Sequence, residues 1–171
     1  MTAPAHSICW LHHAGQHLGL VPSFGGAAAA WQLDRAAGKL DLRHPWSGSL
    51  DRHTLASFPL VPWSNRISAG GFEYGGVHYP VAPNRVGEPY PIHVEGWLQP
   101  WTLSQPQVDT VEMRLTSAAF QGNPYAYQAL QRFVLMEGGM DQTLTVTHTG
   151  AQPLPYGLGQ HPFSCARRAL A

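Results

Sequence analysis

The chain has 171 residues, of which 44% are hydrophobic and only 12% are charged. This charged share is about half of the ~25% usual in globular proteins, which excludes a disordered, highly charged chain. Basic and acidic residues each number 10, and the resulting net charge of zero gives no reason to expect a nucleic-acid or anionic-membrane partner. The 18 glycines and 15 prolines disfavour long helices and favour short strands joined by turns.

The cellular location is inferred from segments that the sequence lacks. Residues 1–14 contain neither the charged region nor the continuous apolar stretch of a signal peptide. The most apolar segment, 18–33, is interrupted by Pro22 and is shorter than the ~20 residues that span a bilayer. The two cysteines, Cys9 and Cys165, are too few for a disulfide framework. We therefore expect a cytoplasmic protein with no membrane partner.

In chain order, the residue pattern around Pro22 first favours strands over a helix. A long loop is expected over 38–62, where charges, glycines and prolines are scattered. A hairpin is expected over 72–81, because Gly75-Gly76 permits the positive φ values of a two-residue primed turn. A second long loop is expected over 82–96.

The second half of the chain is dominated by alternation of apolar and polar residues. It predicts strands over 111–115 and 143–149. Further strands are expected over 97–103 and over 125–136, a long segment rich in aromatic and apolar residues. The alternation in 125–136 is imperfect, so a helix stays open there. No shift in composition marks a linker, and we expect one domain over 1–171. The fold class is all-β, an antiparallel β-sandwich.

Three segments combine polar and aromatic residues, namely 59–67, 91–97 followed by Trp101, and 155–163. Through them the chain resembles the aldose 1-epimerase (galactose mutarotase) family. The matching residues occur in the family's order: Asn65-Arg66-Ile67, 71–76, Asn84, Ile92-His93, Gly96-Trp97, Trp101 and 155–163. The resemblance implies a β-sandwich of the galactose mutarotase-like (supersandwich) type. It also implies a small-molecule aldose in an open groove, without cofactor or metal.

The implied reaction interconverts the α and β anomers of an aldohexose. Ring opening needs one proton taken from the C1 hydroxyl and one delivered to the ring oxygen, and a histidine and a carboxylate suit these roles. By position, His161 is the expected general acid, and His93 is expected to hydrogen-bond the ring oxygen or a neighbouring hydroxyl.

Four further residues are expected at the substrate. Arg66 would orient the sugar, and Asn65 would help to set the loop that carries it. The family usually has a glycine after the first histidine, where this chain has Val94-Glu95, and this change could bring Glu95 near the sugar. Trp97 is either a core residue or a platform for the pyranose ring, whereas Trp101 is expected in the core.

The chain departs from the family at its end. The resemblance implies that a sugar-binding aspartate and the catalytic base, a glutamate, follow the His-Pro-Phe segment, and no residue here matches either one. We expect a sandwich that is incomplete at the C-terminus and that self-associates through exposed sheet edges. Activity that depends on this glutamate would be lost.

Three alternatives stay open. The first is a carbohydrate-binding fragment without catalysis. The second is a hexose-6-phosphate epimerase, for which Arg85 is a candidate phosphate ligand. The third is a metal site of His12, His13 and His17, whose spacing would share one face of a helix.

Overall fold

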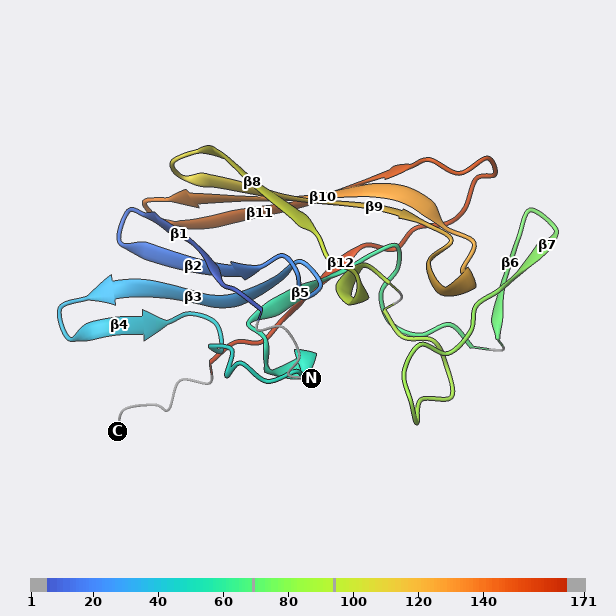
Figure 1. Cartoon of the computed structure of the whole chain (residues 1–171), viewed down its shortest axis with the longest axis horizontal. Coiled ribbons are helices and arrows are strands. Elements are labelled where there is room, and N and C mark those ends of the chain that lie inside the picture. The colour runs from blue at the N-terminus through green and yellow to red at the C-terminus, as the bar shows by residue number, and fades with distance from the viewer. Residues whose placement is uncertain (1–5, 69, 94, 166–171) are drawn as a thin grey trace.

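The computed structural model describes residues 6–68, 70–93 and 95–165. Its strands form two antiparallel sheets that pack as layers, with a separate two-stranded hairpin to one side (Figure 1). The first sheet contains β1 (Cys9–His13), β2 (Gln16–Val21), β3 (Ala27–Arg35), β4 (Gly38–Asp41), β5 (Ser57–Leu60) and β12 (Gly159–Pro162). The second contains β8 (Thr102–Gln107), β9 (Thr110–Ala118), β10 (Ala126–Met136) and β11 (Gly139–His148).

The described residues contain no α-helix. They contain only three short 3-10 turns, η1 (Arg52–Thr54), η2 (Gly96–Leu98) and η3 (Phe120–Gly122). The predicted all-β antiparallel sandwich is therefore confirmed. None of the described residues forms a helix that is long and apolar enough to cross a membrane.

The strands predicted from alternation in the second sheet are confirmed as β9, β10 and β11. Along β10 buried and less buried side chains alternate over the whole strand, so the helix alternative for 125–136 is wrong. The alternation looked imperfect because Gln131 lies on the buried face. Its amide nitrogen donates to the Gly26 carbonyl at 2.8 Å, and its carbonyl oxygen accepts from Gln160 at 3.1 Å. A buried amide with these partners is compatible with the core.

The predicted hairpin is confirmed as β6 (Gly71–Tyr74) and β7 (Val77–Pro80). Gly75 and Gly76 connect the two strands with φ values of 58° and 76°, the left-handed conformation that a primed turn requires. The hairpin projects away from the two sheets (Figure 1).

The strand predicted over 97–103 is wrong in its first half. Residues 96–98 form η2, and the strand begins only at Thr102. A continuous strand would turn Trp97 and Trp101 to the same face, but Trp101 packs in the core between the sheets and Trp97 in a second cluster. The backbone turns between them, and the Trp101 indole N–H donates to the Gly96 carbonyl at 2.8 Å.

The loop predicted over 38–62 is also wrong in part, since it contains β4, η1 and β5. β4 returns along β3 as a short hairpin. β5 pairs with β12, about 100 residues later in the chain, and all four of its residues are buried. Because both faces of β5 are covered, its sequence shows no alternation by which it could be recognised.

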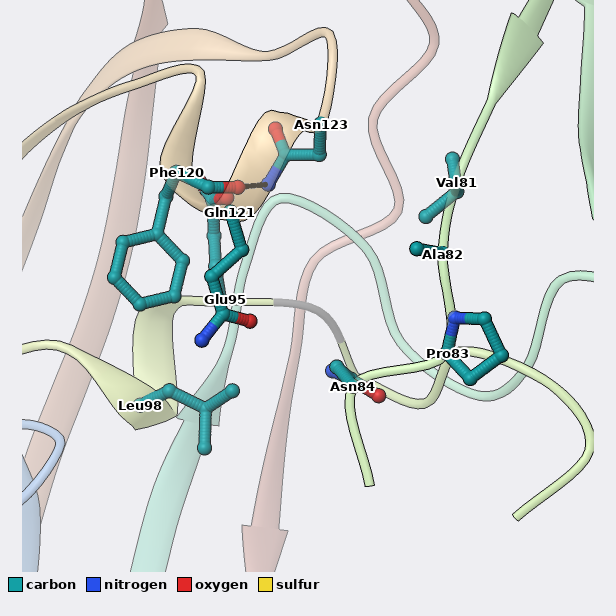
Figure 2. A pocket seen from close by; sticks show the side chains of 9 residues that line it. All are labelled: Val81, Ala82, Pro83, Asn84, Glu95, Leu98, Phe120, Gln121 and Asn123. Carbon is teal, nitrogen blue, oxygen red and sulfur yellow. Dashed lines mark hydrogen bonds between the residues drawn. The ribbon is translucent and has the colours of Figure 1, made fainter. Parts of the chain in front are cut away.

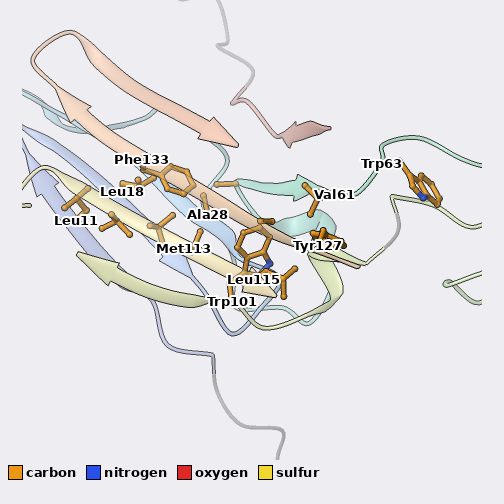
Figure 3. Close-up of a cluster of buried hydrophobic side chains, with 14 of the residues drawn as sticks. Leu11, Leu18, Ala28, Val61, Trp63, Trp101, Met113, Leu115, Tyr127 and Phe133 are labelled. Atoms are coloured by element: carbon orange, nitrogen blue, oxygen red, sulfur yellow. The ribbon is translucent and has the colours of Figure 1, made fainter. Parts of the chain in front are cut away.

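The main hydrophobic core lies between the two sheets, where Leu11 and Leu18 meet Met113 and Phe133 (Figure 3). β3 is buried on both faces, because Ala28 faces this core and Ala27 and Ala29 face the second cluster. The second cluster contains Val21, Phe24, Ala27, Ala29, Leu55, Phe58, Leu60 and Trp97. This cluster forms the floor of the candidate site.

Candidate active site

His161 lies on the first sheet, on the face that carries the second cluster. It belongs to β12 and pairs in register with Phe58 of β5, so the two side chains share one face. Their rings stack at a centroid distance of 4.9 Å and an interplanar angle of 16°. Burial lowers the pKa of His161 below its ordinary value, and the neighbouring His53 lowers it further.

His93 is fixed by Asn65. The His93 N–H donates to the Asn65 carbonyl at 2.9 Å, and the Asn65 N–H donates to Nδ1 of His93 at 3.0 Å. Because Nδ1 accepts, the ring proton of the neutral imidazole is on Nε2. Both residues have positive φ values, 68° for Asn65 and 53° for His93. Such conformations cost free energy outside glycine and concentrate at functional sites.

The two predicted histidines lie together. The centroids of the His93 and His161 rings are 5.7 Å apart, and the rings meet edge to face at 72°. The pKa of His93 is lowered to about 4, first by burial and then by the nearby His161, Arg66 and His53. At neutral pH the His93 imidazole is therefore uncharged, and it combines a donor and an acceptor nitrogen.

His53 is a third histidine at this place, and the sequence analysis did not single it out. The Phe58 ring is flanked by His53 at 6.3 Å, His93 at 6.4 Å and His161 at 4.9 Å between centroids. His53 belongs to η1, inside the segment that was predicted as a loop. The length of that loop was the available signal, because long loops in compact domains usually carry function.

Arg66 borders the site. Its Nε and Nη2 both donate to Oε2 of Glu88, at 3.2 and 3.1 Å. Its backbone forms an isolated antiparallel bridge with Ile92, and the Asn84 side chain both donates to and accepts from the Ile92 backbone. These contacts join the loop after β7 to the segment that carries Asn65 and Arg66.

Glu95 points away from the histidines, towards the second sheet. The side chain is only 1% exposed, and its Oε1 accepts from the Ser117 hydroxyl at 2.7 Å. Burial raises the pKa of Glu95 to about 7, partly offset by the Ser117 and Tyr127 hydroxyls. It lines a small cavity of about 50 Å³ with Asn84 and Asn123 (Figure 2). Glu95 is therefore close to His93 in sequence but is oriented into another part of the molecule.

Trp97 is 6% exposed and stacks on Phe58 at a centroid distance of 5.2 Å. It contributes to the floor of the site, and its ring meets His93 edge to face at 6.4 Å. Trp101 is in the main core, as predicted.

The histidines proposed as a metal site do not share a helix face. His12 and His17 lie opposite each other on β1 and β2, with their Nδ1 atoms 2.6 Å apart, and His17 Nε2 is 2.9 Å from Asp34. His13 pairs instead with Gln16. Within residues 6–68, 70–93 and 95–165, no group of three or more histidine, cysteine, aspartate or glutamate side chains could hold a metal ion.

The fold and the site together define a galactose mutarotase-like β-sandwich with paired histidines. A solved structure from Escherichia coli K12, assigned provisionally as an aldose 1-epimerase, superposes with a TM-score of 0.82 at 29% sequence identity, covering 91% of this chain and 51% of that chain. A galactose mutarotase-like protein from Clostridium acetobutylicum superposes with a TM-score of 0.77 at 20% identity, covering 92% of this chain and 50% of that chain. At this lower identity the likeness shows the fold alone.

The family model of the aldose 1-epimerases matches residues 11–167, and the chain belongs to this family. Two uncharacterised proteins of Escherichia coli K12 are similar in sequence. YphB is 34% identical over 106 residues, which cover 62% of this chain and 36% of YphB. YihR is 26% identical over 169 residues, which cover 94% of this chain and 54% of YihR. The chain thus spans between about a third and half of the length of these relatives.

Proposed function

We propose that the chain carries the histidine half of an aldose 1-epimerase site and interconverts the α and β anomers of an aldohexose. The observation that supports this most is the edge-to-face pair of His93 and His161, with centroids 5.7 Å apart, in a chain of this family. A pyranose above the Phe58 floor would meet both imidazoles at once.

In this proposal His161 delivers a proton to the ring oxygen. Burial and the nearby His53 lower the pKa of His161, so that its protonated form is a stronger acid than an ordinary imidazolium. His93 donates a hydrogen bond from Nε2 to the ring oxygen or to a neighbouring hydroxyl, because Asn65 occupies its Nδ1. Asn65 is a positioning residue, and Arg66 orients the sugar.

The base that removes the C1 proton is not among the residues assigned here. Glu88 already accepts from Arg66, and Glu95 faces Ser117. Both carboxylates are thus engaged elsewhere. We propose that these 171 residues by themselves accelerate the exchange only weakly.

The test is the exchange between the anomers of freshly dissolved α-D-glucose and α-D-galactose, followed by polarimetry. We expect His161→Ala to lower any acceleration by roughly 100-fold or more, the usual contribution of a general acid. His78→Gln is the matched control, since His78 is exposed on the outer hairpin and pairs only with Glu73 among the described side chains. Equal rates for His161→Ala and the unchanged chain would refute the role of His161.

The same protein sample distinguishes an epimerase from the alternative of a carbohydrate-binding fragment without catalysis. Saturable binding of galactose, measured by calorimetry on folded protein that does not accelerate exchange, would support binding without catalysis. Tighter binding of D-glucose 6-phosphate than of D-glucose in the same experiment would support the hexose-6-phosphate alternative.

A further inference from the structure

The carboxyl of Glu95 joins the segment that carries His93 to the second sheet. Glu95 directly precedes η2, and His93 lies two residues before it. Its Oε1 accepts from the hydroxyl of Ser117 on β9 at 2.7 Å, and the same hydroxyl accepts from Nε2 of Gln99 at 2.9 Å. The acid–base roles proposed above leave this buried group without a function.

The surroundings of the carboxyl contain hydroxyls and amides but no cation. Oε2 of Glu95 is buried and has no hydrogen-bond partner among the described residues. The titratable groups that face it are the phenols of Tyr127 on β10, Tyr125 and Tyr156. The cavity beside it is lined by neutral amides and apolar side chains (Figure 2). Because no described lysine, arginine or histidine forms an ion pair with Glu95, an ionised carboxylate would be buried without a counter-charge.

The turn after Glu95 is packed too closely to absorb a movement of its side chain. The Gly96 N–H donates to the Val61 carbonyl at 3.0 Å, and a Cβ on Gly96 would lie 2.2 Å from a methyl carbon of Val61. The Leu98 N–H donates to the Glu95 carbonyl at 3.0 Å, which closes η2. A displacement of Glu95 is therefore passed on to η2 and to the Trp97 ring that η2 carries.

His93 depends on this turn for its position. The Trp97 ring meets the His93 ring edge to face at 6.4 Å between centroids. The other contacts that fix His93 are its two hydrogen bonds with Asn65, one through the backbone N–H and one through Nδ1. The φ of His93 is 53°, and such a conformation persists only where the surrounding structure enforces it.

We propose that Glu95 is a positioning residue for His93 and that it acts as the uncharged acid. While it is protonated, the carboxyl stays buried against Ser117 and keeps η2 and His93 in place. When it ionises, the carboxylate moves towards water, η2 shifts, and the hydrogen bond between Asn65 and His93 is weakened. The role of His93 in anomer exchange rests on the proposed function, whereas the coupling between Glu95 and His93 does not.

The pH range follows from burial, which raises the pKa of Glu95 to about 7. The acid form predominates below pH 7 and is lost as the pH rises through 7. Glu95→Gln keeps a carbonyl oxygen for Ser117 but cannot ionise, so it should hold His93 at every pH. Ser117→Ala removes a hydrogen bond that lowers the pKa of Glu95, so it should move the transition to higher pH.

The first test follows the Asn65 amide signal in NMR spectra of the whole chain between pH 6 and pH 8.5, because this N–H donates to His93. We expect its chemical shift to show a step with a midpoint near pH 7 that Glu95→Gln lacks. Titration of the neighbouring His53 and His161 is common to both chains and does not contribute to the difference. Glu137→Gln, which removes an exposed carboxylate, is the matched control and should keep the step.

The second test measures the exchange between the anomers of α-D-glucose at pH 6 and pH 8 in both chains. One pH unit above its pKa, only about a tenth of Glu95 is protonated. The rate of the unchanged chain relative to that of Glu95→Gln should therefore fall roughly tenfold from pH 6 to pH 8. The protonation of His161 is common to both chains and cancels in this ratio.

The two tests separate this proposal from the epimerase. An Asn65 step that is unchanged in Glu95→Gln would overturn the positioning role, and so would a transition that Ser117→Ala moves to lower pH. The Ser117→Ala result decides the question if Glu95→Gln does not fold. A step that only Glu95→Gln lacks, in a protein that accelerates no exchange, would support the coupling and count against the epimerase. Accelerated exchange with a rate ratio independent of pH would overturn the positioning role and leave the epimerase intact.

Discussion

At the scale of single residues, the site depends on which nitrogen of each histidine is engaged. Asn65 donates to Nδ1 of His93 and thereby leaves Nε2–H to face a ligand. Arg85 donates to Nε2 of His53, so this nitrogen is not available to a ligand. The three histidines around Phe58 are thus not equivalent. His53 and His93 each have one ring nitrogen engaged by a different neighbour, whereas Nδ1 of His161 is buried without a hydrogen-bond partner among the described residues.

Glu95 provides a pH prediction at the same scale. Its pKa is raised to about 7, so the stability it contributes is present below the ordinary value of 4.5 and is lost as pH rises through 7. Glu95→Gln keeps the carbonyl that accepts from Ser117 but cannot ionise. We compare the free energy of unfolding of the variant with that of the unchanged chain. We expect this difference to rise by roughly 2 kcal/mol in favour of the variant from pH 5 to pH 8.

This prediction is checked by urea unfolding at both pH values. The exposed Glu137→Gln is the control and should show no such gain. The histidines add an opposite pH dependence, but it is common to all the chains compared and cancels in the difference. If the difference in free energy of unfolding between Glu95→Gln and the unchanged chain is the same at pH 5 and pH 8, the raised pKa of Glu95 is contradicted.

At the scale of elements, the turn before β3 supports the floor of the site. Gly25 has a φ of 77°, and a Cβ there would lie 2.1 Å from the Trp97 carbonyl oxygen, the atom to which Arg52 donates. We expect Gly25→Ala to lower the free energy of unfolding by roughly 2–4 kcal/mol, from left-handed strain and overpacking together. Gly48→Ala shares the positive φ, 83°, but meets nothing within 4 Å, and should cost only about 1 kcal/mol. Chemical denaturation measures both, and equal losses would show that the contact with η2 is unimportant.

At the scale of the whole molecule, the second sheet has two edges of different character. Edge strand β8 contains Pro106 and an irregular register, both of which impede pairing with another strand. Edge strand β11 has ten residues and pairs only with β10 within the described part of the chain. We therefore propose self-association through β11.

Thr145→Lys tests this, because a lysine on an edge strand opposes pairing between two copies. We expect sedimentation velocity to show concentration-dependent association of the unchanged chain and less of it in the variant. Thr102→Lys, on the other edge strand, is the control and should associate like the unchanged chain. A monomer at every concentration, or association that Thr145→Lys leaves intact, would exclude this edge.

The one-domain interpretation belongs to this scale and stays a prediction. The main core contains Leu11 near one end of the chain and has Tyr156 packed against it near the other. Contacts between such distant segments favour one cooperative unit over 1–171.

The sequence by itself determined the strands of the second sheet, the glycine turn of the hairpin and the family. Alternation of side chains is a local property of a strand with one covered face, and the motifs around Arg66, His93 and His161 are contiguous. These features therefore need no knowledge of which segments meet in space.

Only the tertiary structure decided what surrounds those motifs. The pairing of β5 with β12 brings Phe58 beneath His161 across about 100 residues of chain, and both faces of β5 are buried, which removes its alternation. The same packing adds His53 to the site and turns Glu95 towards Ser117. The direction of a side chain after a turn depends on which sheet that turn packs against, and this contact is settled by burial of distant apolar residues and not by the local sequence.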